Sequence, residues 1–274
     1  MEFIELLKVI FIGIVEGITE WLPVSSTGHM ILVNEFIKLK VTSDYWEMFR
    51  VVIQLGAILA VVVIFWAKIF PFSFKKGEPH IKKDIFTLWS KIVVAIIPAA
   101  VVGIPLDDWM NAHFYNYIVV SIALIFYGIW FIFLERKTNN RQFEITDVSQ
   151  ISYKTAFGIG IFQVLSLIPG TSRSGSTIIG GMILGTSRTV AAEFTFYMAI
   201  PVMFGASLIK LIKFGFAFSG VEAIMLAVGM LTAFLFSIAT IRFLINYVKT
   251  HDFKIFGYYR IVLGIAVVAY FFFK

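Results

Sequence analysis

The sequence predicts an all-α polytopic membrane protein with six transmembrane helices plus two re-entrant helix hairpins, related as an inverted-topology repeat. Of its 274 residues, 59% are hydrophobic and only 15% are charged, where soluble domains average about 45–50% and about 25%. Six apolar stretches are long enough to cross a bilayer, which takes about 20 residues. Two further apolar regions are each interrupted by a polar turn that contains proline.

The first of these interrupted regions, 3–37, opens the chain. Each half is too short to cross the bilayer, so we expect a hairpin that enters and leaves on one side, with its irregular turn covered by protein or by a water cavity. The remaining elements follow in chain order: spans at 48–67, 89–106 and 114–134, the second hairpin at 153–187, and spans at 193–212, 221–243 and 257–273.

Lysine and arginine gather in three loops, which a six-span chain places on one side of the membrane. These loops are 68–88 (Lys68, Lys75, Lys76, Lys82, Lys83), 135–152 (Arg136, Lys137, Arg141) and 244–256 (Lys249, Lys254). The bias of basic residues toward the cytoplasm makes that side cytoplasmic and places both termini outside. Lys210 and Lys213 are the discordant pair. Because these basic loops are distributed along the chain between spans, the net charge of +6 does not predict a nucleic-acid partner.

An internal repeat supports this layout within a single membrane domain, 1–274. Gly13-Ile-Val-Glu16 and the turn after it are echoed by Gly160-Ile-Phe-Gln163 and a second turn. The first repeat runs over about 1–140 and the second over about 150–274, each with one hairpin and three spans. Three spans are an odd number, so the second repeat is inverted, and the two turns meet near the midplane, where inverted-repeat proteins place their sites.

The first turn carries two carboxylates in apolar sequence. Glu16 and Glu20 are four residues apart, so they lie on one side of a helix, and a carboxylate in hydrocarbon costs about 3 kcal/mol on insertion scales. Gly13 and Gly17 share that side and allow another backbone to approach. Pro23 ends the helix. A surface helix ending in a polar turn is the alternative, but the flanks are too apolar for it.

The second turn, Pro169-Gly-Thr-Ser-Arg-Ser-Gly175, has the physics of a phosphate cradle. A helix begins just after it, and a helix N-terminus offers free N–H groups and a positive dipole end. Arg173 adds a planar fork suited to phosphate oxygens, and Glu16 or Glu20 would balance it in an empty site. The alternatives are an interfacial, snorkelling Arg173 and a His29 that is simply a satisfied polar residue in its helix.

Together the two turns resemble the undecaprenyl-diphosphate phosphatase family of the bacitracin-resistance type. Val52-Ile-Gln-Leu-Gly56 and Ala191-Ala-Glu-Phe194 extend the resemblance over the whole chain. It implies hydrolysis of undecaprenyl diphosphate to undecaprenyl phosphate and inorganic phosphate, which recycles the lipid carrier of cell-wall synthesis and gives bacitracin resistance. It also implies divalent-metal dependence, and a site in the bacterial plasma membrane that opens to the extracytoplasmic side.

The expected roles fit phosphoryl transfer, where catalysis is mostly positioning and charge stabilisation. Ser26 is the expected nucleophile, activated by His29 or Glu20, while an attacking water or His29 itself stays open as the nucleophile. Glu16 and Glu20 would hold Mg²⁺ or Ca²⁺, and Arg173 would act on the diphosphate. The remaining substrate-binding candidates are Ser25, Thr27, Gln54, Thr171, Ser172 and Ser174.

Two other functions compete with hydrolysis. A flippase for polyprenyl phosphate would also use inverted repeats and facing hairpins, although a carrier needs no nucleophile. An anion channel would also use helix ends, although paired glutamates argue against it. The expected partners are a polyprenyl diphosphate and membrane lipids, and a homodimer stays open.

Overall fold

The computed structural model describes residues 2–73, 80–138, 142–215 and 217–273, and helices dominate all four ranges. In chain order the elements are α1 (Phe3–Thr19), α2 (Ser26–Phe36), α3 (Ser43–Val52), α4 (Gln54–Ile69), α5 (Lys83–Phe114), α6 (Tyr117–Thr138), η1 (Val148–Gln150), α7 (Tyr153–Val164), η2 (Leu165–Leu167), α8 (Arg173–Ile183), α9 (Arg188–Phe214), α10 (Gly220–Tyr247) and α11 (Lys254–Phe273). Within the described ranges, β-structure is limited to two isolated bridges. Lys75, Lys76 and Arg141 of the predicted basic loops lie outside the described residues.

Six helical segments have the length and composition to cross a membrane, which confirms the predicted spans. They are Ser43–Ile69, Lys83–Met110, Tyr117–Thr138, Arg188–Phe214, Gly220–Tyr247 and Lys254–Phe273. Five of them contain the predicted range whole, because the helices continue beyond the apolar core into the flanking sequence. The third begins at Tyr117 rather than at 114, because the Asn116 side chain accepts a hydrogen bond from the Val119 N–H at 3.0 Å and starts the helix there.

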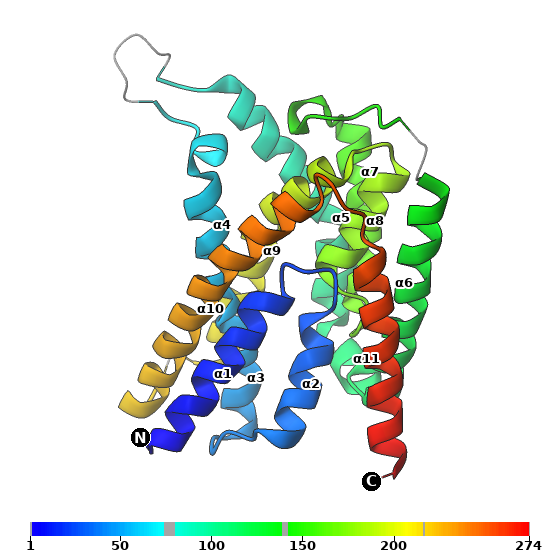
Figure 1. Ribbon diagram of the computed structural model, residues 1–274. Coiled ribbons are helices and arrows are strands. Elements are labelled where there is room, and N and C mark those ends of the chain that lie inside the picture. The colour runs from blue at the N-terminus through cyan, green and yellow to red at the C-terminus, as the bar shows by residue number, and fades with distance from the viewer. Residues whose placement is uncertain (1, 74–79, 139–141, 216, 274) are drawn as a thin grey trace.

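Four shorter helices form two helical hairpins. The helices of the first, α1 and α2, have 17 and 11 residues, and those of the second, α7 and α8, have 12 and 11. All are shorter than the roughly 20 residues that a bilayer crossing takes. In Figure 1, α1 and α2 rise from the end that holds both termini, and the turn between them lies near mid-height.

The glycines of α1 face another backbone, as their spacing predicts. A Cβ at Gly13 would lie 2.8 Å from the Gly229 carbonyl oxygen, and one at Gly17 would lie 2.7 Å from the Ala233 carbonyl oxygen. Both carbonyls belong to α10, so α1 packs against α10 at a distance that only glycine permits. This contact holds the carboxylate-bearing helix in place.

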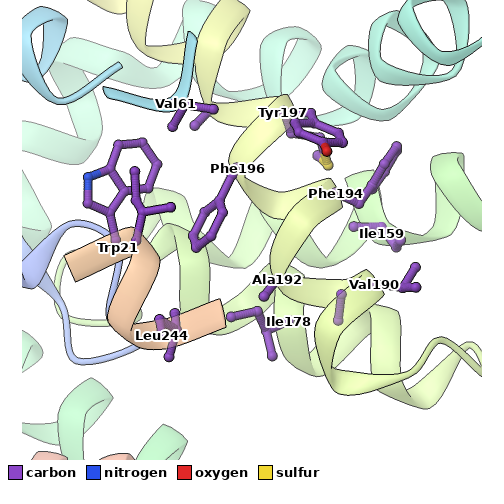
Figure 2. Packing of buried hydrophobic residues seen from close by; sticks show 14 of the residues in the cluster. Trp21, Val61, Ile159, Ile178, Val190, Ala192, Phe194, Phe196, Tyr197 and Leu244 are labelled. Carbon is purple, nitrogen blue, oxygen red and sulfur yellow. The ribbon is translucent and has the colours of Figure 1, made fainter. Parts of the chain in front are cut away.

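The start of α9 forms the centre of the hydrophobic core. Residues 194–199 are buried without interruption, and Figure 2 shows Phe196 pointing toward Trp21 of the first turn. The two rings pack edge to face, with centroids 5.3 Å apart and an interplanar angle of 89°, a favoured aromatic geometry. Trp21 therefore fixes the first turn to α9.

The connections that carry the predicted cytoplasmic lysines lie together at the end of the bundle away from both termini (Figure 1). The structure also accounts for the two discordant lysines. Lys210 pairs with Glu47 at 2.6 Å and with Asp107 at 3.4 Å, and Lys213 pairs with Asp108 at 2.9 Å. Because acidic partners neutralise both lysines, they add no unbalanced positive charge to the opposite end.

Candidate active site

The two turns share an unusual backbone. Ser25 and Ser172 both have φ of 73°, and they are the non-glycine residues with positive φ in the described ranges. Each caps the helix that follows it: the Ser25 hydroxyl accepts from the Gly28 N–H at 3.3 Å, and the Ser172 hydroxyl accepts from the Gly175 N–H at 3.1 Å. A strained conformation of this kind persists where surrounding structure enforces it, often at functional sites.

Ser174 joins the second turn to the first. It is buried, and its hydroxyl lies 3.1 Å from the Glu20 carbonyl oxygen and 3.2 Å from the Leu22 carbonyl oxygen, to which it donates. In this structure the Ser174 hydroxyl thus bonds to the first turn, and its role in substrate binding stays a prediction. Thr171 is also fully buried and is not among the residues that line the cavity between the turns.

Arg260 of α11 fastens the two turns together from behind. Its side chain is completely buried. Nη1 donates to the Pro23 carbonyl at 3.1 Å, and Nη2 donates to the carbonyls of Gly170 and Thr171 at 2.8 and 2.9 Å. No motif in the sequence indicated this residue, although an arginine inside a predicted span is a signal, since intramembrane charges are rare and functional.

Ser26, Glu20 and Arg173 form one hydrogen-bonded group across the two turns. The Ser26 hydroxyl donates to Glu20 Oε2 at 2.6 Å. Arg173 donates to Glu20 Oε1 from Nε at 3.3 Å and from Nη2 at 3.1 Å, while Nη1 donates to the Thr195 carbonyl at 3.0 Å. The Glu20 and Arg173 side chains are only 7% and 11% exposed, so this group lies in a water-poor setting where charge interactions are strong.

Glu16 lies one turn before Glu20 on the same helix face, since the Glu20 N–H bonds to the Glu16 carbonyl at 3.0 Å. Its side chain is buried, and Oε1 has no hydrogen-bond partner among the described residues. Gln54 lies beside the carboxylate. An orphaned buried carboxylate oxygen is costly and suits a hard cation, which takes oxygen ligands.

His29 is held away from Ser26. Its Nδ1 lies 2.8 Å from the Ser25 carbonyl oxygen, and its Nε2 lies 2.7 Å from the Tyr259 hydroxyl, with the two rings stacked at 5.6 Å. A carbonyl only accepts, so Nδ1 carries the proton and Nε2 accepts from the tyrosine. Of the two predicted activators of Ser26, the structure therefore pairs Glu20, and not His29, with the hydroxyl.

A cavity of about 150 Å³ lies between the turns. Seven of the eleven predicted site residues line it: Glu20, Ser25, Ser26, Thr27, Gln54, Ser172 and Arg173. The other four, Glu16, His29, Thr171 and Ser174, are not among its lining residues. Three α9 residues, Val202, Met203 and Ala206, complete an apolar wall that no motif in the sequence indicated.

The chain is similar to known proteins over nearly its whole length. The family model of the bacitracin resistance protein BacA matches residues 9–266. The chain belongs to this family. Two similar relatives are undecaprenyl-diphosphatases from Acetivibrio thermocellus and Enterococcus faecalis, each 59% identical over 98% of both chains. A third, undecaprenyl-diphosphatase 1 of Clostridium acetobutylicum, is 58% identical over 99% of both chains.

The family match confirms the resemblance that the two turns indicated. It also spans every residue of the site, from Glu16 in α1 to Arg260 in α11. With six helices apolar enough to cross a bilayer, the chain is a multi-pass membrane protein of the BacA family.

Proposed function

We propose that the chain hydrolyses undecaprenyl diphosphate to undecaprenyl phosphate and inorganic phosphate, and so returns the lipid carrier to cell-wall synthesis and gives bacitracin resistance. The observation that carries this proposal is the group formed by Ser26, Glu20 and Arg173 at one cavity: a hydroxyl, a carboxylate within 2.6 Å of it, and a guanidinium from the facing turn. A nucleophile next to its base and a phosphate ligand is the arrangement that phosphoryl transfer needs.

Each residue then has a distinct role. Glu20 takes the proton of Ser26 as the hydroxyl oxygen attacks the terminal phosphorus. The bond from that phosphorus to the bridging oxygen breaks, and undecaprenyl phosphate leaves with the bond's electron pair. Glu20 gives up this proton to the solvent or to the departing undecaprenyl phosphate. It then takes a proton from the attacking water and returns it to the Ser26 oxygen as the bond from phosphorus to Ser26 breaks, which releases inorganic phosphate. Arg173 and the N–H groups at the starts of α2 and α8 stabilise the phosphate oxygens throughout.

Arg173 has to change partners for this to occur. It donates to Glu20 in the empty cavity, and a phosphate oxygen offers the same fork a bidentate partner of higher charge. Once Arg173 has turned to the phosphate, the Glu20 carboxylate is free to accept the Ser26 proton. Substrate binding thereby prepares the base.

Glu16 and Glu20, with the Gln54 amide beside Glu16, would hold a Mg²⁺ or Ca²⁺ ion, which would neutralise charge on the phosphate oxygens. The orphaned Glu16 oxygen supports this assignment. Within the described ranges, no three or more His, Cys, Asp or Glu residues are grouped to hold a metal. Further ligands would therefore come from the substrate, as is usual for Mg²⁺ in phosphate chemistry.

The same proposal includes the topology: two re-entrant hairpins in an inverted repeat, with the cavity open to the extracytoplasmic side of the plasma membrane. The matched backbones of the two turns and the grouping of lysines at one end support it. A cysteine introduced at Lys83 should resist an impermeant thiol reagent in intact cells, and labelling there would contradict the orientation. The homodimer stays a prediction.

The decisive measurement is phosphate release from undecaprenyl diphosphate by purified protein in detergent, with and without a chelator. The intact protein should release phosphate, and the chelator should stop it. A flippase for polyprenyl phosphate, or an anion channel, would release none. Full turnover in excess chelator would remove the metal from the proposal while leaving the hydrolysis in place.

A further inference from the structure

A second, larger cleft lies far from the two turns, where α4 ends and where α5 and α9 begin, with η1 beside it. Its volume is about 1100 Å³, and it shares no lining residue with the cavity between the turns. It lies at the lysine-rich end of the bundle (Figure 1). The proposed hydrolysis uses none of its residues.

Four lysines line this cleft, and two of them are not engaged. Lys68 pairs with Glu193 at 3.0 Å, and Lys91 donates to the Ser149 carbonyl at 2.9 Å. Lys82 and Lys83 make no ion pair with any residue in the part of the chain that the structure describes. Their ammonium groups are therefore available to an anion that enters the cleft.

Three carboxylates also line the cleft, and two of them are already satisfied. Glu193 is bound by Lys68 and accepts from the Tyr197 hydroxyl at 3.1 Å. Asp147 caps η1 and accepts from the Ser149 N–H and hydroxyl at 2.9 and 2.6 Å. The third carboxylate, Asp84, is in the first turn of α5, where the positive end of the helix dipole favours a negative charge. The lysines outnumber these carboxylates, so the unmatched charge is positive.

The cleft lies at the lipid boundary. An aromatic series, whose end members Trp66 and Phe86 are chain neighbours of the lining residues Ala67 and Thr87, runs from Trp66 to Phe70, Phe72 and Phe86, with successive centroids 4.3, 5.7 and 6.0 Å apart. Trp66, Phe72 and Phe86 are between 44% and 50% exposed. Aromatic belts with tryptophan mark the headgroup level of a bilayer, so the lysines beside this series are at the depth of lipid phosphates.

We propose that this cleft binds the phosphate headgroup of an anionic glycerophospholipid. Basic pockets between membrane helices at the headgroup level bind such lipids. The acyl chains would lie along the exposed aromatic series, and Lys82 and Lys83 would contact the phosphate. A soluble phosphate would satisfy the lysines but would leave the aromatic surface unused, so the observations favour a lipid.

The test compares lipid binding by two charge-matched variants of the full-length protein. The protein is purified in neutral detergent, and binding of dioleoyl phosphatidylglycerol is measured against dioleoyl phosphatidylcholine by native mass spectrometry. Lysine near an anionic lipid contributes about fivefold in affinity. The double variant Lys82→Gln/Lys83→Gln should therefore bind phosphatidylglycerol about 25-fold more weakly. The control pair, Lys137→Gln/Lys154→Gln, removes the same charge from exposed positions outside the cleft and should stay within about twofold of the parent.

A third variant places a bulky side chain in the cleft without changing its charge. Thr87→Trp should abolish selective retention of phosphatidylglycerol, and retention at the parent level would overturn the location. Equal losses of phosphatidylglycerol binding in the two double lysine variants would show general surface attraction and would overturn the site. If sodium phosphate displaced bound phosphatidylglycerol as effectively as added phosphatidylglycerol does, the assignment to a lipid would be overturned. Since the readout is lipid binding, failure of the proposed hydrolysis leaves this test unaffected.

Discussion

The turn between α1 and α2 and the turn between α7 and α8 are built alike and do different work. Both place a serine with φ of 73° before a helix, and both use that serine's hydroxyl to accept from the N–H of a glycine three residues on. The next residue is Ser26 in the first turn and Arg173 in the second. One backbone arrangement thus presents a hydroxyl on one side of the cavity and a guanidinium on the other.

The helices that precede the two turns also differ in charge. Glu16 in α1 corresponds to Gln163 in α7 in the internal repeat, and both are buried with polar side-chain atoms that lack partners among the described residues. A glutamine in place of the glutamate removes the negative charge from the second hairpin. The two turns therefore share a backbone conformation, whereas the side chains on and before them differ in charge.

The largest expected effect comes from removing the Ser26 hydroxyl, which stands where the second turn has Arg173. Ser26→Ala should lower kcat by about 1000-fold or more, since the nucleophile and its base act as a unit. Ser166→Ala is the matched control: Ser166 lines the same cavity but donates to the Gln163 carbonyl at 2.6 Å, so its kcat should stay within about threefold. The measurement is phosphate release at saturating substrate. A Ser26→Ala enzyme within about tenfold of the parent would assign the attack to water or to His29.

The next effect tests the cation that only the second turn supplies. Arg173→Lys keeps the charge but loses the planar fork, so kcat/KM should fall by about 30-fold to 1000-fold, or about 2–4 kcal/mol. Arg188→Lys is the control, because Arg188 makes an equivalent fork to buried Glu135 away from the cavity; it should lower thermal stability and leave kcat/KM near the parent value. An Arg173→Lys enzyme within about threefold of the parent would make Arg173 a counter-ion to Glu20 rather than a phosphate ligand.

The third effect breaks both turns at once. Arg260→Met leaves three carbonyls, one in the first turn and two in the second, without the donor that they share. Loss of a partner to a buried carbonyl is costly, so the free energy of unfolding should fall by about 2–3 kcal/mol. Thermal unfolding in detergent measures it, with Arg136→Met on the exposed end of α6 as the control. An unchanged midpoint for Arg260→Met would mean that the turns hold their positions without the link.

The smallest expected effect tests the positive φ of Ser25 and Ser172 in the two turns. Glycine adopts positive φ without a steric penalty, whereas alanine does not. We expect the Gly variant to be more stable than the Ala variant by about 1 kcal/mol at Ser25 and by a similar amount at Ser172. This order is the reverse of the order at an ordinary helix position. Equal midpoints for Gly and Ala at only one of the two serines would show that the turns are not equivalent.

Much of this fold followed from local sequence. The six spans are long apolar runs, and length and composition decide whether a helix crosses a bilayer. Both hairpins followed from polar turns that contain Pro23 or Pro169 inside apolar sequence. Proline alone does not end a helix here, since Pro98 and Pro105 lie within α5 and Pro201 lies within α9; the polar residues beside Pro23 and Pro169 mark the turns. The helix ends were less predictable. A cap such as Asn116 depends on one side-chain hydrogen bond rather than on hydropathy.

The site was predictable as a set of residues and not as a network. The motif spacing placed Ser26, Glu20 and Arg173 at one cavity, because residues in two facing turns share the space between them. It left open whether Glu20 or His29 bonds to Ser26, and it did not indicate that the Ser174 hydroxyl bonds to the carbonyls of the first turn. A rotation of one side chain decides each of these contacts, and packing, not spacing, sets that rotation.

Only the tertiary structure decided the contacts between residues far apart in the chain. Tyr259 and His29 are separated by 230 positions, and Arg260 and Pro23 by 237. No periodicity or cap links residues at such separations; α11 brings them together only when its glycines and the bundle pack closely. The sequence by itself determined which groups the site contains, because residue type and local backbone are encoded nearby. Their partners depended on the whole bundle, because a buried donor bonds to whichever acceptor the packing places within about 3 Å.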